Sequence, residues 1–397
     1  MRVLVTLLYY YPDRPSGSTR LGFDQAVYMA QQGHEVWVVT QDPTHQQPEY
    51  SFRDGLHVLQ YPSPEVSTFS LQRLNMHQNL TRKIVEKHIK EPLDVIHGHS
   101  ILQYDGVLSL YKNKARCVYS IHSPMRLEMQ VAARGRGFKV WLKQFITGQI
   151  GNQIEKRILK YSDLVTSDSV FTRAMMDDLH GARWANRIQV IPGWVDTDYF
   201  QIADDRDMLK RQFGWTLDKP LLFTLRRLVP RNGLDNLLYA LADVKSAGYD
   251  FQMIIGGSGE LRDDLEALTR NLNLQDCVQF IGRVSDEDLP LMYAAGDVFI
   301  LPTNDLECFG LITLESLASG RPVLATPVGA IPEVLDAVEP KWLMQNASAS
   351  AIAESIKAYL DGKLPQHNPE DLREYVVSNY AQTYVIPILV AAALGDA

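Results

Sequence analysis

Short apolar runs alternate with segments of helical periodicity along most of the chain, and this alternation restarts near residue 220. The first apolar run covers residues 3–8, and a glycine-containing loop and a helix-like segment separate it from the next run at 34–40. A second series begins at 220–225. Alternating strands and helices are typical of a parallel sheet covered by helices. The sequence therefore predicts an α/β protein with two doubly wound, Rossmann-like domains facing across a cleft.

The composition sets limits on the kind of protein. Of the 397 residues, 46% are apolar and 22% are charged, and the net charge of −8 makes nucleic acid an unexpected partner. Cys117, Cys277 and Cys308 are widely separated and form no metal-ligand spacing, which suits a reducing cytosol. No apolar stretch approaches the length of a membrane-spanning helix, and residues 1–11 are better explained by a buried strand than by a signal peptide. We expect a cytoplasmic protein.

Two carboxylates eight residues apart, Glu307 and Glu315, follow the predicted buried strand at 297–303. Gly310 between them lets the backbone approach a ligand, and the free N–H groups at the start of the next helix suit an anion. Glu315 falls about one turn into that helix, where a carboxylate can accept two hydroxyl groups. This order of groups would fit a sugar, a phosphate and a ribose. The alternative is a pair of ordinary surface acids near a helix start.

The stretch from Glu307 to Glu315 resembles the Glu-x7-Glu motif of retaining glycosyltransferases of the GT-B fold, specifically family 4. The resemblance extends over residues 281–333 and includes the runs at 320–326 and 328–333. It implies an enzyme that transfers a hexose from a nucleotide diphosphate sugar, with UDP as the favoured nucleotide, to an acceptor hydroxyl in glycan or glycolipid biosynthesis. It also implies that no metal and no cofactor are needed, because the nucleotide sugar is a co-substrate. Attack would take place on the front face, with the leaving phosphate as the base.

The same resemblance assigns roles to residues of the second domain. Glu307 would bind hydroxyl groups of the donor sugar, and Glu315 would bind the ribose. The diphosphate would be held by Arg227 and by the loop residues Cys308, Phe309, Gly310 and Leu311. Backbone groups near Arg283 and Val284 would read the edge of the base.

The segment 226–233 departs from the family pattern of Gly-Arg-Leu followed by Lys-Gly. Arg227 matches the family arginine, but Arg226 stands in place of the glycine and Asn232 in place of the lysine. A fixed cation stabilises a departing diphosphate by several kcal/mol. We expect Arg231 to supply the missing charge, with Arg226 as the other candidate. If neither does so, the protein would bind a nucleotide sugar without turning it over.

In the first domain, polar residues follow several predicted strands, at the edge where α/β sheets bind ligands. His122 matches the family histidine that contacts the donor sugar, although a satisfied, half-buried histidine would look the same. His99 and Arg126 are expected on the acceptor side, and His97 is expected to be structural. Gly17 lies in the loop that, in the family, approaches the donor diphosphate, but it can also be a plain turn residue.

Residues 126–160 carry eight cations and two acids, which gives +6 for the segment and −14 for the remainder. Aromatic and aliphatic residues are interleaved with these cations, a mixture that can lie on an anionic membrane or hold a lipid-diphosphate acceptor. The alternative is a helix that covers the core with a solvated basic face. Gly148 and Gly151 interrupt the helical periodicity and favour that alternative.

The resemblance also implies where the domains begin and end. It implies a first domain at 1–196, a second at 197–375, and a last helix at 376–397 that packs back on the first. The Asp196-Thr197-Asp198 run resembles a metal site, but we interpret it as the end of the first domain. A nucleotide-sugar epimerase of the same architecture remains an alternative function.

Overall fold

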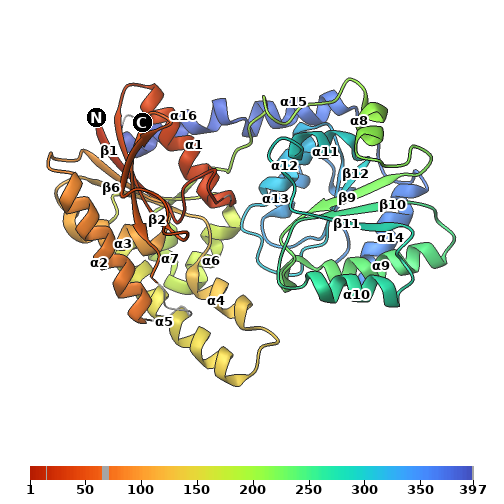
Figure 1. Ribbon diagram of the computed structural model, residues 1–397, viewed down its shortest axis with the longest axis horizontal. Coiled ribbons are helices and arrows are strands. Elements are labelled where there is room, and N and C mark those ends of the chain that lie inside the picture. Colours follow the sequence, from red (N-terminus) through yellow and green to blue (C-terminus); the bar gives the residue numbers. More distant parts are fainter. Residues whose placement is uncertain (15, 65–70, 396–397) are drawn as a thin grey trace. The chain divides into compact units, whose positions relative to one another are not determined.

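A computed structural model describes residues 1–14, 16–64 and 71–395 (Figure 1). The chain forms two compact units, one of Met1–Gly193 with Val385–Ala397 and the other of Trp194–Tyr384. These divisions fall within about ten residues of the boundaries expected at 196/197 and 375/376. Pro15, in the glycine-containing loop before the first helix, and residues 396–397 of the tail lie outside the described residues.

The first unit is built on an eight-stranded sheet in the order β3-β4-β2-β1-β5-β6-β7-β8. All neighbouring strands are parallel except β3 and β4. In the centre of the sheet Val3 pairs with Val36 on one side and Val95 on the other, and these residues are buried. The strands are β1 (Arg2–Thr6), β2 (Glu35–Asp42), β3 (Tyr50–Arg53), β4 (Leu56–Pro62), β5 (Val95–Gly98), β6 (Arg116–Ile121), β7 (Leu164–Ser167) and β8 (Ile188–Val190).

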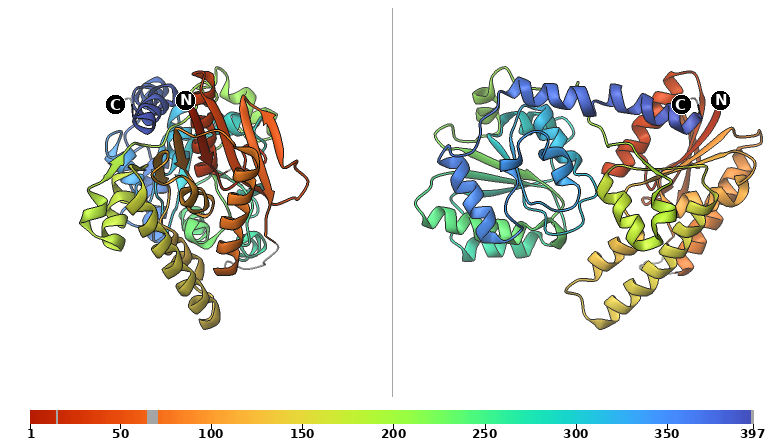
Figure 2. Two further views of the ribbon diagram at one scale, coloured as in Figure 1. Left: turned by 90° about the vertical axis from the view of Figure 1, so that its left-hand side faces the viewer. Right: turned by 180° about the vertical axis from the view of Figure 1, so that it is seen from behind.

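Helices cover this sheet. Leu74 in α2, Val107 in α3 and Ile158 in α5 belong to one buried cluster with Leu4 of β1 (Figures 1 and 2). The last helix, α16, ends against the first unit, where Arg116 Nε donates to Ala393 O at 3.0 Å. The helices are α1 (Gly17–Gln31), α2 (Leu71–His88), α3 (Ile101–Tyr111), α4 (Met125–Ala133), α5 (Phe138–Tyr161), α6 (Val170–His180), α7 (Ala182–Ala185) and α16 (Gln382–Leu394).

Helix α5 is continuous through Gly148 and Gly151, the two glycines that interrupt its periodicity in the sequence. Their role is close packing against α4. A Cβ atom on Gly151 would lie 2.6 Å from Met125 Sδ, and one on Gly148 would lie 3.4 Å from the backbone of Arg126. In both figures the α4–α5 pair extends beyond the sheet of the first unit.

The second unit has a five-stranded, fully parallel sheet in the order β11-β10-β9-β12-β13. Its core is aromatic at the centre, where Phe223, Phe299 and Tyr293 pack with ring centroids 5.0–5.4 Å apart. The strands are β9 (Leu221–Leu225), β10 (Gln252–Gly256), β11 (Val278–Gly282), β12 (Val298–Leu301) and β13 (Val323–Ala325). The helices are α8 (Arg206–Gln212), η1 (Pro230–Asn232), α9 (Leu234–Ser246), α10 (Arg262–Asn271), α11 (Leu289–Ala295), α12 (Leu311–Ala318), α13 (Ile331–Leu335), η2 (Pro340–Trp342), α14 (Ala349–Leu360) and α15 (Pro369–Tyr380).

The prediction of an α/β fold with two parallel-sheet units is therefore confirmed. Among the residues that the structure describes, no helix is both long enough and apolar enough to cross a membrane.

Candidate functional site

The loop after β12 carries the two carboxylates and is fixed by backbone contacts. Gly310 has a positive φ of 85°, which favours glycine, and α12 begins at the next residue. Ala330 N donates to Glu307 O at 2.9 Å. A Cβ atom on Gly329 would lie 2.0 Å from the same carbonyl oxygen, so only glycine allows this approach. The backbone around Glu307 therefore has little freedom.

The carboxylate of Glu307 forms an ion pair with Arg226, which the sequence did not predict. Arg226 Nη2 lies 2.6 Å from Glu307 Oε2, and the other guanidinium nitrogen, Nη1, donates to the hydroxyl of Thr303. The arginine side chain is 7% exposed and the glutamate side chain 19%. Each of these nearly buried charges is compensated by the opposite charge of its partner. The residue in place of the family glycine thus puts a cation beside Glu307.

The segment 226–233 is held in place by a glycine turn that follows β10. Arg226 N donates to Gly256 O, and a Cβ atom on Gly257 would lie 1.8 Å from Arg226 O. Asn232 is buried and uses its side-chain amide to donate to Arg227 O at 2.7 Å. Asn232, at the position of the family lysine, thus stabilises the backbone and carries no charge.

Two of the predicted diphosphate contacts, Arg227 and Arg231, belong to this segment, and the others in this unit lie in the loop before α12 or at its first residue. Arg227 is exposed, and Arg231 lies in the 3-10 turn η1, where its carbonyl accepts from Asn304 N at 2.8 Å. Phe309 is buried and packs near Tyr380, so only its backbone can face a ligand. Cys308 is partly buried.

Glu315 lies in the second turn of α12, partly buried. Burial, and after it the nearby Glu315 carboxylate, hold the pKa of the Tyr293 hydroxyl well above its usual value. Arg283 is exposed and Val284 is partly buried, both directly after β11. These predicted nucleotide contacts follow β12 and β11 of one sheet, in which β9 and β10 lie between the two strands.

In the first unit, His99 and His122 follow β5 and β6, and their rings are joined by a hydrogen bond of 2.9 Å between Nδ1 and Nε2. His122 Nδ1 lies 3.5 Å from the carboxylate of Asp168, which follows β7 and was not predicted from the sequence. Burial raises the pKa of Asp168. His97 is fully buried. The histidines predicted separately thus belong to one cluster.

The other predicted residues of the first unit are Gly17 and Arg126. Gly17 is the first residue of α1, and the Ser16 hydroxyl caps this helix by accepting from Thr19 N at 3.3 Å. Arg126 lies in the first turn of α4, partly buried.

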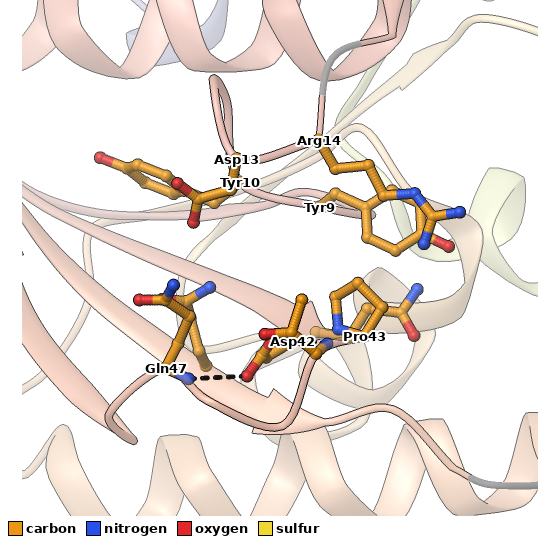
Figure 3. A pocket seen from close by; sticks show the side chains of 10 residues that line it. Tyr9, Tyr10, Asp13, Arg14, Asp42, Pro43 and Gln47 are labelled. Atoms are coloured by element: carbon orange, nitrogen blue, oxygen red, sulfur yellow. Dashed lines mark hydrogen bonds between the residues drawn. The ribbon is translucent and has the colours of Figure 1, made fainter. Parts of the chain in front are cut away.

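A cavity of about 340 Å³ opens at the carboxyl ends of β1, β2 and β4 in the same unit (Figure 3). Tyr9 and Arg14 lie on one side, with the guanidinium 4.4 Å from the ring centroid. Asp42 and Gln47 lie on the other side, where Gln47 N donates to the Asp42 carboxylate at 2.8 Å. The cavity is lined by Tyr9, Tyr10, Asp13, Arg14, Gln41, Asp42, Pro43, Thr44, Gln47 and Gln60.

The sequence interpretation missed this cavity, although the polar run 41–44 directly after a predicted strand was a usable signal. Burial alone would raise the pKa of Asp42, but hydrogen bonds from Thr44, Gln46 and Gln47 outweigh it and lower that pKa. The lining combines aromatic rings, amides, a carboxylate and a guanidinium. Such groups can pack against and hydrogen-bond a polyhydroxylated ligand.

The Asp196-Thr197-Asp198 run has a structural role. Asp196 Oδ1 accepts from the backbone of Asp198 and of Tyr199, both at 3.0 Å, and so closes a turn. Among the residues described, no group of three or more histidine, cysteine or acidic side chains could hold a metal ion.

Comparison with known proteins identifies the family to which the chain belongs. Residues 15–199 match the model of Glycosyltransferase Family 4, and residues 205–379 match that of Glycosyl transferases group 1. The chain belongs to family 4 of the glycosyltransferases and has the GT-B fold.

One curated relative is the GDP-mannose-dependent alpha-(1-6)-phosphatidylinositol monomannoside mannosyltransferase of Mycobacterium tuberculosis. It is 30% identical over 220 residues, which are 53% of this chain and 56% of that protein. The chain therefore spans about half the length of the curated relatives it matches first.

Solved structures show the same fold over the whole chain. Sucrose-phosphate synthase from Thermosynechococcus elongatus superposes with a TM-score of 0.83, at 20% identity and 98% coverage of both chains. A protein of Anabaena, HepE, in complex with UDP and glucose superposes with a TM-score of 0.76, at 17% identity and full coverage of both chains.

Proposed function

We propose that the protein is a retaining glycosyltransferase that moves a hexose from a nucleotide diphosphate sugar to an acceptor hydroxyl. The observation that carries the proposal is the pairing of Arg226 with Glu307 at the carboxyl ends of β9 and β12, in front of the α12 N-terminus. This arrangement provides a carboxylate for sugar hydroxyls and a cation for a diphosphate within one rigid unit.

The remaining donor contacts are proposed from the resemblance. Glu315 would accept the ribose hydroxyls, Arg283 and Val284 would lie at the base, and Arg227 and Arg231 would contribute charge to the diphosphate. In the first unit, His122 and Gly17 would meet the donor sugar and diphosphate. No metal enters this scheme, because cations and helix amides meet the phosphate charge.

The donor nucleotide has two candidates. The resemblance favours UDP. The name of the mycobacterial relative makes GDP-mannose the second candidate donor. A thermal-shift screen of UDP-glucose, UDP-N-acetylglucosamine and GDP-mannose, followed by mass spectrometry of products in EDTA, tests the proposal. Transfer to an added acceptor supports it. Conversion of the donor without an acceptor would instead indicate an epimerase, and binding without turnover an inactive protein.

The cavity beside Tyr9 is our candidate for the acceptor, which we propose to be a carbohydrate or a lipid-linked carbohydrate. It lies at the same edge of the same sheet as His99 and His122. Aromatic faces pack against the apolar side of a sugar ring, while amides such as that of Gln47 bind its hydroxyl groups. His99 and Arg126 were assigned to the acceptor from the sequence and remain part of this proposal.

Tyr9→Ala should therefore raise the KM for the acceptor about tenfold, which corresponds to about 1.4 kcal/mol of lost binding. The KM for the donor should stay unchanged. Steady-state kinetics with each substrate varied in turn measures both values. Tyr239→Ala, which alters an exposed tyrosine on α9, is the matched control. An unchanged acceptor KM in Tyr9→Ala would exclude the cavity as the acceptor site.

The α4–α5 pair supports peripheral contact with an anionic membrane. Phe138, Trp141 and Phe145 stack along α5 with ring centroids 5.4–5.8 Å apart, and all are exposed. Lys139 and Lys143 lie among them on the same helix. Aromatic groups that enter a lipid interface beside basic residues are typical of membrane-surface helices. We propose that this pair brings the protein to lipid-linked acceptors at the inner face of a membrane.

A Trp141→Ser/Phe145→Ser variant should bind vesicles of anionic phospholipid about tenfold more weakly than the wild type, because two interfacial side chains are lost. Flotation of protein with anionic and with neutral vesicles measures the effect. Phe52→Ser, which removes an exposed aromatic residue from β3, is the control and should bind normally. Equal binding of the wild type to neutral and anionic vesicles would contradict the proposed contact.

A further inference from the structure

A continuous chain of hydrogen-bonded side chains runs inward from His122 in the first unit. His122 Nε2 lies 2.9 Å from His99 Nδ1, and His99 Nε2 lies 2.7 Å from the amide oxygen of Gln25. The Gln25 amide nitrogen lies 2.8 Å from His97 Nδ1, and His97 Nε2 lies 2.8 Å from the hydroxyl of Ser120. We call the set Asp168, His122, His99, Gln25, His97 and Ser120 the polar chain.

The polar chain is buried and tightly packed. Gln25 and His97 are fully buried, and the imidazole rings of His97 and His99 stack with centroids 4.5 Å apart. Gln25 reaches them from α1, one turn after Gly22. A Cβ atom on Gly22 would lie 2.9 Å from His99 Cγ, so the glycine lets α1 approach the ring. The rings and the amide therefore have little room to turn.

The Gln25 amide gives the polar chain a direction. Its oxygen can only accept and its nitrogen can only donate, so His99 Nε2 carries a hydrogen and His97 Nδ1 does not. Burial lowers the pKa of His97 to about 3 and holds the pKa of His99 well below its usual value, so both rings are neutral. A neutral imidazole carries one hydrogen on its two nitrogens. Since that hydrogen is on Nε2 of His99, its Nδ1 is an acceptor. The hydrogen between His99 and His122 must then belong to His122 Nε2.

The other nitrogen of His122 faces a carboxylate. Nδ1 lies 3.5 Å from Asp168 Oδ2, and lone pairs that face each other at this distance repel unless one of the two atoms carries a hydrogen. We propose that Gln25, acting through His99, is a positioning residue that holds the hydrogen of His122 on Nε2 and so keeps a second proton between His122 Nδ1 and Asp168. Only the role of His122 at the donor sugar rests on the proposed function.

A ring held in this way keeps its orientation and its proton when a substrate arrives. Fixing a group near the reacting atoms contributes to the rate, and small displacements reduce it strongly. A half-turn of the Gln25 amide would reverse every donor in the polar chain. His99 would then donate from Nδ1, and His122 Nε2 would carry no hydrogen. The two arrangements therefore differ at atoms that can be observed.

Nuclear magnetic resonance of the full-length protein labelled with ¹⁵N-histidine distinguishes them. Two-bond ¹H–¹⁵N correlations show which ring nitrogens carry hydrogen, and His99→Gln and His122→Gln variants assign the signals. We expect hydrogen on Nε2 of His97, His99 and His122 at neutral pH. Hydrogen on Nδ1 of His99 together with a bare Nε2 on His122 would overturn the proposal. This result does not depend on any enzymatic activity.

The variant Gln25→Leu tests the consequence. It should release the His99 tautomer and lower kcat about tenfold to a hundredfold with little change in the KM for the donor. Gln103→Leu is the matched control, because Gln103 is also fully buried and donates to Tyr61 Oη at 2.9 Å, outside the polar chain. It should keep kcat within about twofold. Equal losses of kcat in the two variants, with an unchanged His122 tautomer in Gln25→Leu, would show that Gln25 has only a structural role.

Discussion

Replacing Arg226 by glycine should lower kcat by about a hundredfold to a thousandfold, because it removes a fixed cation next to the site of the leaving diphosphate. No lysine at position 232 is present to stabilise the negative charge that develops on the diphosphate. Asn232 instead donates a hydrogen bond to the backbone carbonyl of Arg227. Arg226 is held in place by Glu307 and Thr303. Donor turnover, measured as released nucleoside diphosphate, gives the effect. A melting curve checks that Glu307, left without its partner, does not unfold the loop.

The double variant Arg226→Gly/Asn232→Lys is the sharper form of this test. It moves the cation to the position that the family pattern provides, so we expect it to recover most of the activity lost in Arg226→Gly. Arg231→Ala measures how much Arg231 contributes to turnover. The sequence analysis expected this residue to supply the charge of the missing lysine. A hundredfold loss in Arg231→Ala with normal turnover in Arg226→Gly would assign the charge to Arg231.

Glu307→Ala should abolish detectable transfer, a loss of at least about a hundredfold, while the affinity for free nucleoside diphosphate stays within a few fold. The carboxylate is expected to bind the sugar and not the nucleotide. Glu315→Ala is the complementary variant and should weaken the nucleotide itself, because hydrogen bonds to a charged group contribute about 1.5–3 kcal/mol each. Titration calorimetry and turnover measured on both variants separate the two roles. Near-normal turnover in Glu307→Ala would exclude the sugar contact.

Much of the fold could be predicted because each strand is a short, continuous apolar run. The runs expected at 3–8 and 34–40 became β1 (Arg2–Thr6) and β2 (Glu35–Asp42), and the run at 297–303 contains β12. Parallel strands are buried on both faces, so their sequences signal them directly. The packing role of the two glycines of α5 could not be predicted, because the residues they approach lie in α4, a neighbour in space that periodicity does not reveal.

The candidate site could be predicted only as far as its motifs are local in sequence. Glu307, Gly310 and Glu315 lie within one loop and helix, and the structure keeps them there. The partner of Glu307 is Arg226, which lies 81 residues earlier and meets it because β9 and β12 are neighbours in the sheet. Asp168 joins His122 for the same reason, through β6 and β7. Such contacts depend on strand order, which no single segment encodes.

The most direct test of the proposed function is the anomeric configuration of the product formed in EDTA. The protein would be incubated with an α-linked nucleotide hexose from the thermal-shift screen and its acceptor, and the new glycosidic bond would be examined by proton NMR. Our account predicts an α-linked product, with the amount of transfer unaffected by EDTA. A β-linked product, or activity that is lost in EDTA and restored by magnesium or manganese, would contradict it.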